Sequence, residues 1–115
     1  MTNDVKTKLE EFSLGIIGSL KAGVRPFTMQ YSSSQIGLGD FCAFAGSTIS
    51  HLVNNGTISV AEKKESAAYM VSVFMKTFGH NATFSELNEF SDMVLEQNVI
   101  DKNFAGIVAA IKFAR

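Results

Sequence analysis

The sequence predicts an all-α protein: a compact bundle of four to five helices with one long irregular connection at about residues 24–39. Three observations predict this fold class. Apolar residues recur every three or four positions along most of the chain, which is the period of an amphipathic helix. Capping residues and glycine stops divide the chain into segments of helical length. No pair of alternating segments joined by a tight turn predicts a β-hairpin.

The composition indicates one folded domain, residues 1–115, with a sizeable core. Hydrophobic residues make up 46% of the chain and charged residues only 18%, with a net charge of −1. So few charges predict either a surface rich in Ser, Asn and Thr or an apolar surface that another subunit or partner covers. The scattered lysines and arginines form no basic stripe, which argues against a nucleic-acid partner.

The first predicted helix begins at Asn3 or Asp4, either of which is a good cap, and ends before Gly23. Gly15 and Gly18 each weaken such a helix by roughly 1 kcal/mol relative to Ala. We interpret them as marking a close crossing with another helix. The apolar stripe of this helix, widened by Ile17, is expected to be Val5, Leu9, Phe12, Ile16 and Leu20.

The irregular connection contains the candidate partner-binding residues. It combines a cation, two aromatic rings, hydroxyls and an amide, and aromatic residues with arginine tend to anchor interfaces. An equally good alternative is that its apolar side chains lie under the connection and complete the core. The candidate residues are Arg25, Phe27, Tyr31, Ser33 and Gln35.

Capping signals predict the starts of the remaining helices. Asp40 is expected to cap the second helix, which runs to about residue 54, and a fifth helix is expected to follow Asp101. The third and fourth helices, ending at Gly79 and near residue 98, open with capping boxes, in which two side chains satisfy each other's end amides. The boxes are Ser59–Glu62 and Thr83–Glu86.

The apolar stripes of the second, third and fourth helices follow the same spacing. They are expected at Phe41, Phe44 or Ala45, Thr48 and Leu52, then at Ala67, Val71, Phe74 and Phe78, and finally at Leu87, Phe90 and Val94.

No catalytic, cofactor-binding or metal-binding residue is predicted, and no cofactor. A calcium loop with Gly56 at its sixth position would have His51 and Val53 where carboxylates are needed, so helix capping explains this loop better. His51, His80 and Cys42 lack the number and spacing of ligands that zinc requires. Cys42 lies in the first turn of a helix, but its neighbours predict a buried, inert thiol.

A cytoplasmic location is expected. Cys42 is the only cysteine, so an internal disulfide is impossible, and a lone thiol fits a reducing compartment. The N-terminal residues show no secretion-signal pattern, and no apolar run is long enough to span a bilayer.

Three functions remain open. The leading hypothesis is a small non-enzymatic interaction protein (adaptor, regulator or inhibitor) that acts through protein contacts and associates with itself. The second is a small apolar-ligand binding or sensing protein with a cavity lined by Phe and Met. The third is an enzyme with dispersed catalytic residues drawn from Arg25, Tyr31, Asp40, Cys42 and His51.

Overall fold

The computed structural model describes residues 1–22 and 38–95 of the chain. Within these ranges it contains four α-helices, one short 3-10 helix and no strand, so the prediction of an all-α bundle is confirmed. The fifth helix predicted after Asp101 and most of the predicted connection lie outside the described residues. The elements are α1 (Asn3–Lys21), α2 (Leu38–Asn54), η1 (Val60–Glu62), α3 (Lys63–Thr77) and α4 (Phe84–Leu95).

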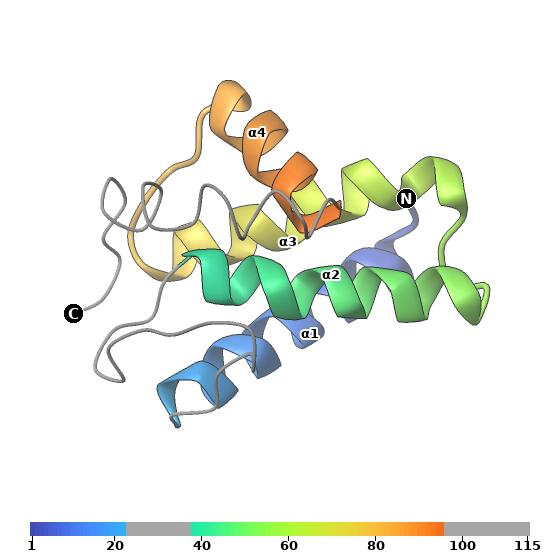
Figure 1. The fold of residues 1–115 in the computed structure, drawn as a ribbon, viewed down its shortest axis with the longest axis horizontal. Helices are drawn as coiled ribbons and strands as arrows, with labels where there is room; N and C mark the ends of the chain where they lie inside the picture. Colours follow the sequence, from blue (N-terminus) through green and yellow to red (C-terminus); the bar gives the residue numbers. More distant parts are fainter. Residues whose placement is uncertain (23–37, 96–115) are drawn as a thin grey trace.

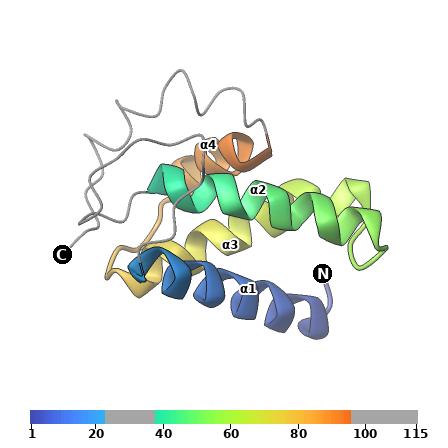
Figure 2. The same ribbon diagram turned by 60° about the horizontal axis from the view of Figure 1, so that its bottom comes forward.

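α2 and α3 form the centre of the described fold, because each of them packs against all three other helices (Figure 1). Figure 2 shows α1 and α4 on opposite sides of the α2–α3 pair. Met1 meets Glu65 at the start of α3, whereas Lys21 lies 5.8 Å from the centroid of the Phe78 ring at the end of α3. α1 and α3 therefore run in the same direction.

The core lies between these helices and is built from large side chains. The rings of Phe41 and Phe74 have centroids 4.7 Å apart, and those of Phe74 and Phe78 are 5.0 Å apart. Burying one such side chain contributes roughly 1.5–3 kcal/mol. The other large apolar residues with at most 1% exposure are Leu9, Leu20, Ile49, Met70, Val71, Met75 and Val94.

The buried face of α1 differs from the predicted stripe. Phe12 was expected in the core but is 40% exposed, whereas Ser13 is fully buried. Ser13 tolerates burial because its hydroxyl donates a hydrogen bond to the Leu9 carbonyl oxygen at 2.8 Å. Burial thus follows Leu9, Ser13, Ile17 and Leu20, and Phe12 lies at the margin of the buried face.

Two predicted helix starts are also corrected. Thr2 caps α1, and its hydroxyl accepts a hydrogen bond from the Val5 amide at 3.2 Å. α2 already begins at Leu38, so Gly39 is helical and Asp40 lies within the first turn rather than at the cap. A carboxylate within the first turn still interacts favourably with the positive end of the helix dipole, so Asp40 favours a helix start without occupying the cap.

Both predicted capping boxes are present. The Ser59 amide donates to the Glu62 carboxylate at 2.9 Å, and the Thr83 amide donates to the Glu86 carboxylate at 2.9 Å. The first box opens a single 3-10 turn, η1, that continues into α3. Gly79, with φ +81°, ends the segment after α3 as predicted.

The predicted stripes on α2, α3 and α4 are largely confirmed. On α2, Ala45 is fully buried and Phe44 is only partly buried, which settles the alternative at that position. Met70 lies in the core of α3, although the prediction did not include it, whereas Phe78 and Leu87 are only partly buried.

Gly15 and Gly18 do not mark a close helix crossing. A Cβ atom added at either position would meet no atom within 4 Å, so both glycines face open space. The interpretation of these glycines as marks of a close helix crossing is therefore wrong.

Candidate functional site

The five residues predicted to bind a partner, from Arg25 to Gln35, all lie outside the described residues. The candidate sites that the structure does describe are two hollows, one on each side of α1. Neither was predicted from the sequence.

The first hollow, here called the mixed hollow, is an open depression of about 470 Å³ between α1 and α3. The exposed side of α3 forms its floor, and the connection between α3 and α4 with the first turns of α4 closes one end. The lining combines charged, polar and apolar side chains. It consists of Glu10, Leu14, Tyr69, Ser72, Val73, Lys76, Thr77, His80, Asn81, Ala82 and Leu87.

Glu10 lies on the α1 wall of the mixed hollow, and Lys76 lies on its α3 floor. Both side chains are exposed, and among the described residues neither takes part in an ion pair. The hollow therefore offers one negative and one positive group that do not neutralise each other directly.

The hydroxyl groups of the α3 floor are turned toward their own helix. Ser72 donates to the Tyr69 carbonyl oxygen at 2.6 Å, and Thr77 donates to the Val73 carbonyl oxygen at 2.7 Å. Since each hydroxyl has used its proton, it presents only acceptor lone pairs to the hollow. The donors that remain along the floor are those of Lys76 and Tyr69.

A hydrogen-bonded pair holds the closed end of the mixed hollow. His80 Nε2 lies 3.0 Å from Glu86 Oε1, and the Glu86 amide in turn donates to the Thr83 hydroxyl at 3.1 Å. The hydrogen bonds from the Thr83 amide and then from His80 lower the pKa of Glu86. The ionised carboxylate thus fixes both the start of α4 and the position of the His80 ring.

The second hollow, here called the apolar hollow, lies between α1 and α2 and has a volume of about 330 Å³. Among the described residues, no titratable side chain lines it. Gly15 leaves its floor open, and the partly exposed ring of Phe12 stands at its side. The lining residues are Phe12, Gly15, Ile16, Ser19 and Phe44.

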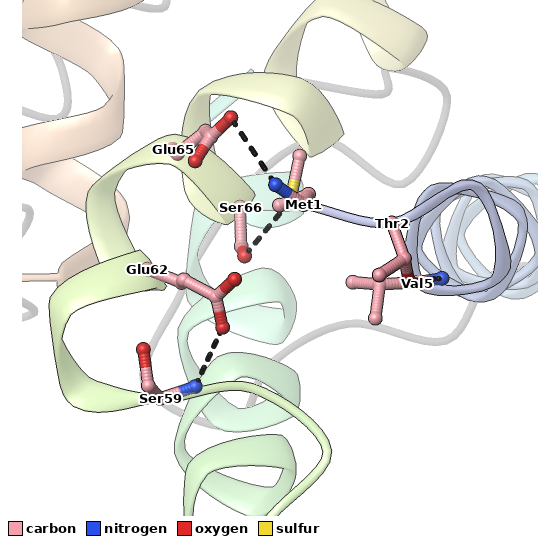
Figure 3. A network of polar contacts seen from close by, with 7 residues as sticks. All are labelled: Met1, Thr2, Val5, Ser59, Glu62, Glu65 and Ser66. Atoms are coloured by element: carbon pink, nitrogen blue, oxygen red, sulfur yellow. Dashed lines mark hydrogen bonds and ion pairs between the residues drawn. The ribbon is translucent and has the colours of Figure 1, made fainter.

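The N-terminal residues fix one end of α1 against α3 (Figure 3). The Met1 ammonium lies 3.9 Å from Glu65 Oε2, and the buried Ser66 hydroxyl donates to the Met1 sulfur at 3.4 Å. In the same region the Ser59 amide holds the Glu62 carboxylate, and this hydrogen bond lowers the pKa of Glu62. The two contacts of Met1 therefore join the start of α1 to the start of α3.

The third hypothesis was an enzyme with dispersed catalytic residues. Of these residues the structure describes Asp40, Cys42 and His51, and they do not share a cleft. Burial raises the pKa of the Cys42 thiol to about 12, which favours the unreactive protonated form, as predicted for an inert thiol. Asp40 is buried, and His51 is exposed near the other end of α2, beside Asn55. Arg25 and Tyr31, the other two members, lie outside the described residues.

Residues 1–22 and 38–95 hold no cluster of three or more His, Cys, Asp and Glu side chains placed to hold a metal ion. In the loop after α2, where a degenerate calcium loop was considered, the Asn55 side chain instead accepts hydrogen bonds from the Thr57 amide at 3.0 Å and the Thr57 hydroxyl at 2.7 Å.

The helices of the described part of the chain are all too short or too polar to cross a membrane. Comparison with known proteins gives no family: no family model, no curated protein and no solved structure matches this chain.

Proposed function

We propose that this protein is a small, non-enzymatic interaction protein, an adaptor, regulator or inhibitor that works through contacts with polypeptides. The observation that carries the proposal is the apolar, uncharged surface of α1. Residues 12–20 include no charged side chain, and within them Phe12, beside the apolar hollow, is 40% exposed. A helix surface that meets only water normally carries charged and polar side chains.

The partner that fits the apolar hollow best is a second copy of the chain. A two-fold contact brings the same patch together from both copies, so the patch must contain a protruding group and a recess for it. Phe12 protrudes, and Gly15 and Ser19, one and two turns further along α1, form the recess. With two such helices crossing in opposite directions, each Phe12 ring enters the recess of the other copy.

Light scattering over a range of protein concentrations tests this proposal. We expect the wild-type mass to rise from that of one chain to that of two, and Phe12→Ala to keep the mass of one chain throughout. Phe84→Ala is the matched control, because Phe84 is an 87% exposed ring on another helix. A wild-type protein that stays a monomer, or equal effects of the two substitutions, would contradict self-association through α1.

A second function, binding of a small apolar ligand, is favoured by one observation. The apolar hollow has a volume of about 330 Å³, at the lower end of the range for small-molecule sites. Its lining includes Phe12 and Phe44 but none of the buried methionines of the core. Native mass spectrometry separates the two functions: a co-purifying small mass favours a ligand, and a clean dimer favours the protein contact.

A cytoplasmic location is part of the proposal. It rests on Cys42, the chain's one cysteine, whose buried thiol suits a reducing compartment.

A further inference from the structure

We propose that the mixed hollow binds short peptides of two or three residues that have both termini free and at least one apolar side chain. This inference is independent of the proposed self-association, which uses the other side of α1. The observation behind it is that an acid on α1, Glu10, and a base on α3, Lys76, line one hollow together with apolar side chains such as Leu14.

The charges select a ligand that carries both signs. A simple anion would meet Lys76 but also the Glu10 carboxylate, and a simple cation would meet the reverse. A peptide with free ends places its ammonium near Glu10 and its carboxylate near Lys76, so each charge meets its opposite. The lone pairs of the Ser72 and Thr77 hydroxyls accept hydrogen bonds from the ligand's amides, since both hydroxyl protons are already donated to α3.

The length of the hollow selects the number of residues. Its floor runs along α3 from Tyr69 to Lys76, which at 1.5 Å per residue is about 10 Å. An extended chain advances about 3.3–3.6 Å per residue, so two or three residues span that length. The volume of about 470 Å³ also lies within the range of small-ligand sites.

The apolar part of the lining accommodates the side chain of the ligand. Leu14 is 46% exposed and stands on the α1 wall, opposite Val73 on the floor and Leu87 on α4. An aliphatic side chain placed among these three covers apolar surface that is now exposed to water. Leu14 thus has a role on this side of α1 that differs from the role of Phe12 on the other.

An NMR titration of the full ¹⁵N-labelled chain tests this inference. The probe is leucyl-leucine, compared with its N-acetylated form, its C-amidated form and free leucine. We expect saturable shifts of the amide signals around Lys76, His80 and Asn81 with the free dipeptide. Each blocked terminus weakens binding about fivefold, the loss expected for one half-exposed ion pair.

Substitutions of Glu10 and Lys76 test which of these residues binds each terminus of the dipeptide. Glu10→Gln is expected to weaken binding of the free dipeptide about fivefold and to abolish the effect of N-acetylation, while the effect of C-amidation persists. Lys76→Gln is expected to do the opposite. The matched controls are Glu11→Gln, the adjacent acid outside the hollow, and Lys63→Gln, at the start of α3, and both are expected to bind like wild type.

The inference is overturned by any of three results. The first is the absence of saturable shifts up to about 10 mM dipeptide, where even a weak complex would be populated. The second is binding that does not depend on the blocked termini, and the third is free leucine binding as tightly as the dipeptide. Circular dichroism of each variant shows whether it is folded, which is expected because Glu10 and Lys76 are exposed.

Discussion

The two sides of α1 differ in chemistry although they belong to the same helix. The side toward α2 carries an apolar hollow whose described lining has no titratable group, whereas the side toward α3 carries a mixed hollow lined by both an acid and a base. Phe12 and Leu14, only two residues apart, project into these different surroundings. The exposed surface of α1 is therefore not uniform, because its two flanks line hollows of different chemistry.

The largest expected effect concerns the core that both hollows share. Phe74→Ala removes a fully buried ring that contacts Phe41 and Phe78, and it should lower the free energy of unfolding by about 3–5 kcal/mol. Urea denaturation measures this loss. Phe12→Ala should cost much less, because its ring is 40% exposed. Equal losses would mean that Phe12 supports the fold and is not a surface group.

A smaller loss of stability is expected from a substitution at the closed end of the mixed hollow. Thr83→Ala removes the hydroxyl that accepts from the Glu86 amide, and it should cost about 1 kcal/mol, the usual value for a helix cap. Ser85→Ala, in the same turn, is the control. Urea denaturation measures this loss of stability. Because Thr83 lies at the closed end of the mixed hollow and not at the apolar one, Thr83→Ala should weaken dipeptide binding but leave self-association unchanged. Loss of self-association in this variant would show that the two hollows are coupled.

In the apolar hollow, a substitution is expected to change the free energy of unfolding by a similar amount but to raise it. Gly15→Ala should raise the free energy of unfolding by up to about 1 kcal/mol, because Ala favours the helix and its Cβ meets no atom within 4 Å. The same methyl group fills the recess proposed for Phe12 of a second copy, so the dimer should weaken. Thermal denaturation and light scattering measure the two effects. A more stable chain that dimerises as well as wild type would exclude the recess.

The acid dependence of stability tests the role of the Glu86 carboxylate at the closed end of the mixed hollow. The pKa of Glu86 is lowered in the folded protein from 4.5, so its contribution to stability is present above that pH and is lost as the pH falls through the lower folded value. Glu86→Gln should therefore flatten part of the acid-induced loss of stability below about pH 4.5, leaving the part due to Glu62. Denaturation at several pH values checks this. A variant with an unchanged acid profile would contradict the role of the carboxylate.

The smallest effect is expected away from both hollows. Lys64 and Asp92 form an ion pair at 2.8 Å with about half of each side chain exposed, so Asp92→Asn should cost no more than about 1 kcal/mol. Added salt should reduce that cost further. Neither dimerisation nor dipeptide binding should change, which makes this variant a control for a change of surface charge. An effect on either would extend the binding surface to the side of α4 that carries Asp92.

Much of the fold was predictable because local signals determine it. The capping boxes at Ser59 and Thr83 and the stop at Gly79 each depend on a few adjacent residues. The burial of Ser13 was not predictable, because spacing alone does not show that a hydroxyl can satisfy itself on its own helix. That one polar residue shifts the buried face of α1 and leaves Phe12 at the surface.

The candidate sites were predictable only in part. The low charge content left two alternatives open, a surface rich in Ser, Asn and Thr or an apolar surface that a partner covers, and the uncharged residues 12–20 were a local sign of where an apolar surface would lie. The mixed hollow could not be predicted, because it joins Glu10 and Lys76 from helices that are far apart in the sequence. The regular spacing of Tyr69, Val73 and Lys76 identifies one side of α3, but nothing in it predicts the opposite wall.

The most direct measurement of the central claim is an isotope-filtered NOE experiment on a mixture of ¹³C-labelled and unlabelled copies of the wild-type chain. It detects only contacts between two copies. Self-association through α1 predicts signals between the Phe12 ring of one copy and the Ile16 methyl groups of the other. Intermolecular signals that arise only from other helices, in a sample that light scattering shows to be dimeric, would contradict it.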